Sequence, residues 1–286
     1  MSFPSWTLLA QSVLSGVFAG ALYGLLGLGL GLSWGLLRTI NLAHFAFAFL
    51  AAYICWQLGT SAKMDPLATL VVIVPAMFAM GAGLHWLTDR FKLTPFSSLL
   101  MTFGCMGIAE SAMQTIWTAD PRKLESHWSD LKLRVGPLFV PIPELLTLVL
   151  AVGICFGAWA MLRYTDLGKA LRASAEDAPI AAAFGINQHR NGFMLAGACS
   201  ALAGIAGVCI ALSGSISPSQ MYTWIGVVFA VVMMGGLGSA LGPLIAGLII
   251  GVSEAVTMAV TSPSWAPLVS FTLLIVILLV KPGRVR

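Results

Sequence analysis

Charged residues, prolines and polar clusters divide the sequence into long apolar runs, and this pattern constrains the fold more than any other feature. A helix that crosses a bilayer needs about 20 apolar residues. The runs that reach or approach this length are 8–37, 42–58, 66–88, 96–118, 143–163, 192–213, 222–237, 241–260 and 267–281. Two of them, 222–237 and 241–260, are short and rich in glycine at their junction. The sequence therefore predicts an all-α, polytopic transmembrane helical bundle of about eight or nine spans, forming one domain over residues 1–286.

The composition supports a chain whose main surroundings are a lipid bilayer. Of the 286 residues, 58% are hydrophobic and 9% are charged, and the mean hydropathy is +0.93. Soluble domains carry about 25% charged residues. This difference excludes a soluble enzyme, a disordered protein and a nucleic-acid binder.

The residue types that usually build a catalytic or metal site are scattered. The five cysteines all fall inside apolar runs, at Cys55, Cys105, Cys155, Cys199 and Cys209. Their odd number argues against a disulfide framework, and no CxxC pair suggests a metal. The four histidines have no paired ligand spacing, and the sequence lacks a GxxxxGK[ST] phosphate loop. We therefore expect no metal, no cofactor bound by this chain and no catalytic residues.

The distribution of basic residues predicts the orientation, because loops on the cytoplasmic side are enriched in Lys and Arg. With nine spans, ten basic residues fall on the predicted inner side: Arg38, Arg90, Lys92, Arg163, Lys169, Arg172, Arg190, Lys281, Arg284 and Arg286. Five fall outside: Lys63, Arg122, Lys123, Lys132 and Arg134. The segment up to Thr7 has no basic residue, so we expect no cleaved signal peptide. The prediction is a multi-pass protein with a cytoplasmic C-terminus.

Two hydrophilic segments are longer than the others. Residues 119–142 contain several prolines and are expected to be irregular and external. Residues 164–191 are rich in alanine and predict one or two short cytoplasmic helices. Asp177 is placed to cap the second helix, Pro179 fits its first turn and Gly185 is placed to end it.

Small residues recur within the apolar runs. Glycines are spaced by four at Gly16, Gly20 and Gly24, at Gly31 and Gly35, and at Gly247 and Gly251. This spacing lets helix backbones approach closely. Packing within one bundle is the favoured interpretation, and a subunit interface is the alternative.

The segment from Gly235 to Pro243 interrupts the apolar pattern most strongly. Its glycines, Gly235, Gly236 and Gly238, favour an unwound backbone, which lipid tolerates only where the backbone faces protein or a water-lined cavity. We interpret it either as a tight turn between two short spans or as a Gly-rich broken helix that lines a translocation path.

Four polar residues stand in or beside the spans. Glu110 is expected to face the bundle interior or water, either in a structural hydrogen bond to a neighbouring helix or as a functional carboxylate. Glu254 is expected near the outer interface. Asn41 is interpreted as a helix cap and His44 as an interfacial residue, with a place in the translocation path as the alternative.

The motifs around these residues resemble the branched-chain amino acid ABC importer permeases of the LivH type. The resemblance rests on Leu171–Asp177 followed by Ala182 and Phe184–Asn187, on Ile40–His44, and on Gly235–Ser239 with Gly242 and Gly247. These stretches have the order and approximate spacing of the family's RA-x-AED, GIN, IN-x-AH and GGxGS elements. Phe45 departs from the pattern, since the family usually has glycine after the histidine.

The resemblance implies a membrane-spanning permease subunit of an ATP-driven importer in the bacterial inner membrane. Its partners would be a second, homologous permease subunit, two ABC ATPase subunits that bind ATP and Mg²⁺, and a periplasmic solute-binding protein. The loop at about 164–191 would be the cytoplasmic coupling helix. The expected contacts to the ATPase are Glu176, Asp177, Ala182, Phe184 and Gly185. The expected translocation-path residues are Asn41, His44, Glu110, Gly235, Gly236 and Gly238.

Other functions remain open on the sequence alone. A permease of this kind could carry branched-chain or related amino acids, urea or short amides. An ion-coupled secondary transporter that uses Glu110 is a different class, but it would need no coupling loop. A membrane enzyme lacks any paired nucleophile or metal set.

Overall fold

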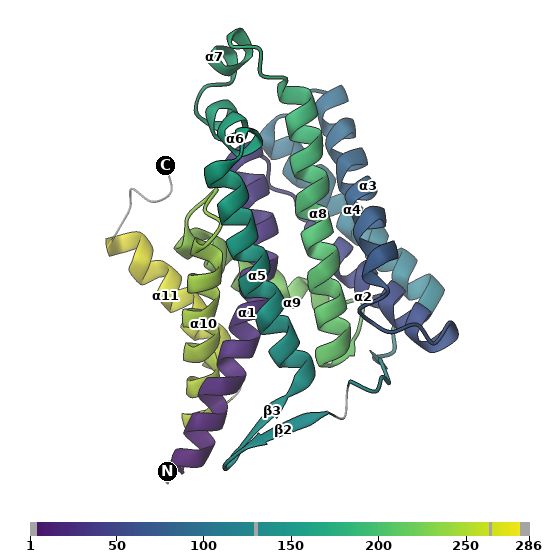
Figure 1. Ribbon diagram of the computed structural model, residues 1–286, viewed down its shortest axis with the longest axis vertical. Helices are drawn as coiled ribbons and strands as arrows, with labels where there is room; N and C mark the ends of the chain where they lie inside the picture. Colours follow the sequence, from purple (N-terminus) through teal and green to yellow (C-terminus); the bar gives the residue numbers. More distant parts are fainter. Residues whose placement is uncertain (1–4, 129–130, 263–264, 281–286) are drawn as a thin grey trace.

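A computed structural model describes residues 5–128, 131–262 and 265–280 as a bundle of long helices (Figure 1). Lys281, Arg284 and Arg286, which were predicted to lie on the inner side, fall outside the described residues. The helices are α1 (Trp6–Leu37), α2 (Ala43–Ser61), α3 (Leu70–Arg90), α4 (Pro95–Trp117), α5 (Ile142–Tyr164), α6 (Asp166–Glu176), α7 (Ala178–Ala183), α8 (Gln188–Ser213), α9 (Gln220–Gly235), α10 (Gly242–Val260) and α11 (Ala266–Val280). The strands are β1 (Arg122–Lys123), β2 (Lys132–Val135), β3 (Leu138–Pro141) and β4 (Ser215–Ile216). This architecture confirms the predicted all-α bundle.

Within the described part of the chain, seven helices are long and apolar enough to cross a membrane: α1, α2, α3, α4, α5, α8 and α10. The two further spans expected at 222–237 and 267–281 correspond to α9 and α11, which have 16 and 15 residues. The bundle has two distinct ends in Figure 1. One end carries α6 and α7 and is called the α7 end; the other carries the β2–β3 hairpin and the start of α1 and is called the hairpin end.

Helix α1 packs along α10 through the glycines that the sequence singled out. A Cβ atom on Gly16 would lie 2.7 Å from the carbonyl oxygen of Gly251, and one on Gly20 would lie 2.5 Å from that of Gly247. Real Cβ atoms do not approach backbone so closely, so only glycine permits this contact. Without a hydrophobic force between helices in lipid, such close packing is a main source of helix association. The expectation of packing within one bundle is confirmed.

Helix α8 forms the other half of the core, where it packs against α2 and α3. The largest fully buried side chains there include Tyr53, Phe45 and Phe49 of α2 and Met77 of α3. Four of the cysteines are buried in the bundle and Cys105 is half-buried, and all five are free thiols. The interpretation of the cysteines as small buried apolar residues is therefore confirmed for the four buried ones.

The glycine-rich segment forms the turn between α9 and α10. Gly236 and Gly238 have positive φ angles of 90° and 74°, which favour glycine. The backbone nitrogen of Gly238 donates to the carbonyl oxygen of Gly31 at 3.0 Å, so a carbonyl group of α1 satisfies this N–H group of the turn. The helical structure is interrupted between Gly235 and Gly242, as the sequence predicts. Of the two interpretations, the structure shows the tight turn between two short helices.

The expectation of an irregular segment at 119–142 is wrong for its second half. Strands β2 and β3 form an antiparallel hairpin in which Lys132 faces Pro141 and Val135 faces Leu138. The turn is made possible by Gly136, whose φ is +62°. The prolines next to the turn conceal the strand pattern in the sequence.

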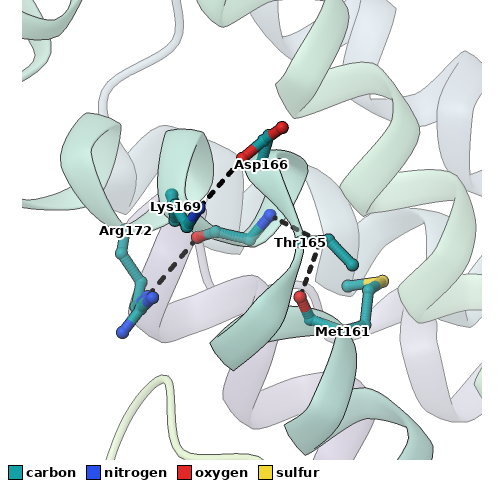
Figure 2. Close-up of polar contacts among 6 residues, drawn as sticks. Met161, Thr165, Asp166, Lys169 and Arg172 are labelled. Carbon is teal, nitrogen blue, oxygen red and sulfur yellow. Dashed lines mark hydrogen bonds and ion pairs between the residues drawn. The ribbon is translucent and has the colours of Figure 1, made fainter.

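A tight joint connects α5 to α6 (Figure 2). Thr165 has an extended backbone, its hydroxyl donates to the carbonyl oxygen of Met161 at 2.6 Å, and its Oγ1 accepts from the nitrogen of Gly168 at 3.1 Å. Lys169 and Asp166 form an ion pair at 3.0 Å on the exposed side. Gly168 packs on the backbone of Leu162, where a Cβ atom would collide. The joint therefore fixes the direction in which α6 leaves the bundle.

Candidate functional site

The short helix α7 stands at the tip of the α7 end (Figure 1). Asp177 caps it, because its carboxylate accepts from the nitrogen of Ile180 at 3.0 Å, and Pro179 occupies the first turn. Gly185 follows the last turn of α7. Its φ of +84° is an angle that glycine adopts without strain. The predicted start and end signals of this helix are confirmed.

The apolar side chains of α7 divide into an anchor and an exposed pair. Ala181 is 3% exposed and faces the protein. Phe184 is 83% exposed and Ile180 is 57% exposed. Glu176, Asp177, Ala182 and Gly185 are exposed around them. The structure thus gathers all five residues predicted to contact the ATPase on one protrusion, and it adds Ile180 as a second exposed apolar side chain.

Three polar contacts hold the base of this protrusion. The guanidinium of Arg38, at the end of α1, donates to the carbonyl oxygen of Ala175 at 2.6 Å. The side-chain amide of Gln188 donates to the carbonyl oxygen of Ala178. His189 Nδ1 lies 2.6 Å from a carboxylate oxygen of Asp89, which ties the start of α8 to α3. The protrusion is therefore connected to α1, α3 and α8.

The interpretations of Asn41 as a helix cap and of His44 as an interfacial residue are wrong. The N-cap of α2 is Leu42, with no side-chain cap, and Oδ1 of Asn41 is buried without a hydrogen-bond partner. His44 is 1% exposed and lies in the core, where Nε2 is 3.1 Å from the carbonyl oxygen of Leu26. Gly29 leaves the space that the imidazole ring fills. The chain turns at Arg38 and α2 begins inside the core at Ala43, which removes His44 from the interface.

Glu110 makes the structural hydrogen bond that the sequence analysis favoured. The hydroxyl of Tyr222 on α9 donates to Oε2 of Glu110 at 2.7 Å, and Gln114 donates to Oε1 at 3.1 Å. Glu110 is half-buried between α4 and α9. Asn41, His44, Glu110 and the 235–238 turn therefore lie at separate places and do not form one cavity lining.

A buried polar cluster that the sequence analysis did not assign lies between α1, α9, α10 and α11. Glu254 is 8% exposed; the Tyr23 hydroxyl donates to it at 3.2 Å and the Ser270 hydroxyl donates to its other oxygen. Glu254, which was expected near the outer interface, lies six positions before the end of α10 and is covered by α11. A cavity of 520 Å³ lies beside this cluster. The charge of Glu254 inside an apolar run was the available signal, whereas nothing in the sequence marks Tyr23 or Ser270.

Comparisons with known proteins agree with the fold. Residues 12–278 match the family described as "Branched-chain amino acid transport system / permease component". The permease LivH of Escherichia coli, from a high-affinity branched-chain amino acid transport system, is 25% identical over 95% of this chain and 93% of its own length. LivH of Salmonella typhimurium gives the same values. BraD of Pseudomonas aeruginosa is 24% identical over 95% of this chain and 94% of its own length.

No solved structure matches the chain significantly. The family match extends over nearly the whole bundle, from α1 to α11, and it includes α7 and the turn between α9 and α10. The chain therefore belongs to the family of branched-chain amino acid transport permeases, which are multi-pass membrane components of bacterial transport systems.

Proposed function

We propose that this chain is the membrane-spanning permease subunit of an ATP-driven importer that carries branched-chain or related amino acids. The family match supports the transport function. The observation that carries the coupling role is Phe184, an aromatic side chain that is 83% exposed at the C-cap of α7, a helix held by an N-cap, a proline and a following glycine. A rigid, exposed aromatic residue is the usual anchor of a protein interface.

The partners follow from this role. Two ATPase subunits bind ATP and Mg²⁺ and receive α7 in a groove, a second homologous permease subunit completes the membrane pore, and a periplasmic binding protein delivers the solute. The protein lies in the bacterial inner membrane with α7 and the C-terminus in the cytoplasm. The excess of Lys and Arg in the loops at the α7 end supports this orientation.

The contacts at the base of α7 suggest how ATPase movement reaches the bundle. A shift of α7 acts on α5 through the Thr165 joint, on α1 through Arg38 and on α3 through His189 and Asp89. These three helices pack on different parts of the core. A rigid-body displacement of α7 would therefore move several spans together rather than bend one loop.

Replacing Phe184 tests the coupling role. Loss of a buried aromatic anchor costs at least about 2 kcal/mol of binding free energy. We expect Phe184→Ala to leave the permease in the membrane, to weaken co-purification of the ATPase subunits and to lower leucine uptake by proteoliposomes of the complete complex. Phe91→Ala is the matched control, since Phe91 is 66% exposed at the α7 end and lies outside α7.

Gly185→Val provides a second variant, because a β-branched residue is strained at a φ of +84°. It should distort the end of α7 and reproduce the effect of Phe184→Ala. Normal ATPase co-purification and normal uptake in both variants would show that α7 is a solvated loop, and the coupling role would be refuted.

A further inference from the structure

Two cavities lie on opposite sides of one aromatic wall in this bundle. The wall is formed by Tyr23 of α1 and Trp224 of α9, whose ring centroids are 5.5 Å apart in an edge-to-face arrangement. Both residues line a cavity of 360 Å³ on one side and the 520 Å³ cavity on the other. The wall is thus the shared boundary of two spaces that are each large enough for a small solute.

The 360 Å³ cavity lies toward the hairpin end. It is lined by the first turns of α5, including Glu144 and Thr147, by Pro141 of β3 and by Ser213 at the end of α8. One carboxylate oxygen of Glu144 is buried without a hydrogen-bond partner. The cavity nearer the hairpin therefore presents an unsatisfied acceptor.

The 520 Å³ cavity has Glu254 in its lining. The residue stands six positions before the end of α10 at Val260, which is about 9 Å along a helix. Both of its oxygens accept from neutral hydroxyl groups, and across the described ranges no ion pair reaches it. A carboxylate at membrane depth without a cation is costly and marks a functional site by default.

Aromatic rings complete the lining of the 520 Å³ cavity. Tyr23, Tyr222, Trp224 and Phe271 line it together with Glu254. The Phe271 ring packs over Gly226, where a Cβ atom would lie 2.8 Å from the ring. Aromatic faces attract cations, and a carboxylate beside them supplies the opposite charge. None of the described residues that line this cavity carries a positive charge, so the site is suited to a ligand that brings one.

We propose that the Glu254 cavity binds the ammonium group of the transported solute, and that the Glu144 cavity is the chamber from which the solute enters it past Tyr23 and Trp224. This inference rests on the proposed transport function and names the residues that would touch an amino acid. The ammonium group would pair with the carboxylate of Glu254 and lie next to the rings of Trp224 and Phe271. The apolar side chain of the solute would lie against the remaining wall of the cavity.

Chemical labelling tests the charge of the cavity without any transport assay. Thr223 lines the cavity, whereas Ser219 is exposed at the start of α9 outside it. Cysteines are placed at each position in the purified complex carrying Cys105→Ser, and they are labelled with a trimethylammonium-ethyl or a sulfonato-ethyl methanethiosulfonate. We expect the cationic reagent to react faster at position 223, the preference to be lost in Glu254→Gln, and the ratio at position 219 to stay the same.

Transport tests the role of the solute. We expect Glu254→Gln to lower leucine uptake by the reconstituted complex at least about tenfold, the smallest loss expected when a charge-assisted hydrogen bond is removed. ATPase co-purification and the melting temperature should stay close to wild type. Phe271→Leu keeps an apolar side chain, removes the aromatic face and should also lower uptake. The controls are Glu125→Gln, on an exposed loop carboxylate, and Ser253→Ala, which borders Glu254 but bonds within its own helix to Ile249.

Each outcome decides one question. Equal reactivity of the two reagents at position 223, or a preference that survives Glu254→Gln, overturns the proposal that the cavity attracts a cation. Wild-type uptake in both Glu254→Gln and Phe271→Leu overturns the proposal that the solute passes there. Failure of the wild-type complex to carry leucine refutes the proposed function instead, and the labelling preference still decides whether the cavity attracts a cation.

Discussion

The guanidinium of Arg38 donates a hydrogen bond to the carbonyl oxygen of Ala175 at 2.6 Å, which joins the end of α1 to the last turn of α6. Arg38 itself has a left-handed backbone with φ of 55°, so α1 ends at the residue that makes the contact. The longest helix of the bundle is thereby connected to the base of α7, although 137 positions separate the two residues in the sequence.

Arg38→Ala is expected to weaken this connection without detaching α7. The bond is exposed, so its loss should cost no more than about 1 kcal/mol. ATPase co-purification should persist because Phe184 is unchanged, while the leucine taken up per ATP hydrolysed by the reconstituted complex should fall. Arg90→Ala, which removes an exposed charge at the same end of the bundle, is the control. Equal coupling ratios in the two variants would argue against transmission through α1.

Gly168→Ala is expected to disrupt the joint between α5 and α6. The added methyl group would meet the backbone of Leu162, and backbone cannot move aside as a flexible side chain can. Overpacking of this kind typically costs about 2 kcal/mol. The melting temperature in detergent should fall, and protease cleavage between α6 and α8 should become faster. Gly157→Ala is the control, because nothing lies within 4 Å of its added Cβ; similar behaviour of the two variants would contradict the prediction.

Gly20→Val is expected to separate α1 from α10. Its Cβ would lie 2.5 Å from the carbonyl oxygen of Gly247, so the two helices must move apart along their whole contact. We expect a lower yield of folded protein in the membrane and a lower melting temperature. Gly104→Val has open space around it on α4 and should be tolerated. A stable, fully folded Gly20→Val protein would refute the close packing.

Glu110 has a structural role that two substitutions can separate from a functional one. Gln at this position keeps an oxygen that can accept from the Tyr222 hydroxyl, whereas Leu does not. We expect Glu110→Leu to melt at a lower temperature than Glu110→Gln, by an amount that reflects one hydrogen bond of about 1 kcal/mol. Identical melting temperatures with a selective loss of uptake would instead favour the functional carboxylate.

Asp65, in the loop between α2 and α3, gives the stability a dependence on acid pH. Partial burial raises the pKa of its carboxyl, but hydrogen bonds from Trp128 and Leu67, together with His127, outweigh this and hold the pKa below its usual value of 3.8. A depressed pKa stabilises the fold above the unfolded-state value, and this contribution disappears as pH falls through the lower folded-state value.

The measurement is the melting temperature between pH 6 and pH 3, about two units above and one below the usual carboxyl value. Wild type should lose more stability over this range than Asp65→Asn, which keeps an oxygen for Trp128 but no titratable group. Parallel curves for the two proteins would show that Asp65 does not contribute to the acid sensitivity.

The local signals in the sequence were sufficient for several elements. The apolar runs located the long helices, because a run of about 20 apolar residues has few alternatives to a membrane span. Asp177, Pro179 and Gly185 located α7, because a cap, a fixed φ and a positive φ act within one turn of the chain. The glycine spacing along α1 and α10 indicated close packing, because glycines four residues apart lie on one face of a helix.

The tertiary structure alone decided which polar groups meet. Asn41 has the residue type of a cap but is displaced from that role, and His44 is drawn into the core beside Gly29. Tyr23, Trp224 and Glu254 come from three helices that are apolar on most sides, so no amphipathic pattern shows which face points inward. Helix boundaries depend on interactions a few residues apart, whereas a cavity depends on how separate helices rotate and pack, and that information is absent from any single segment.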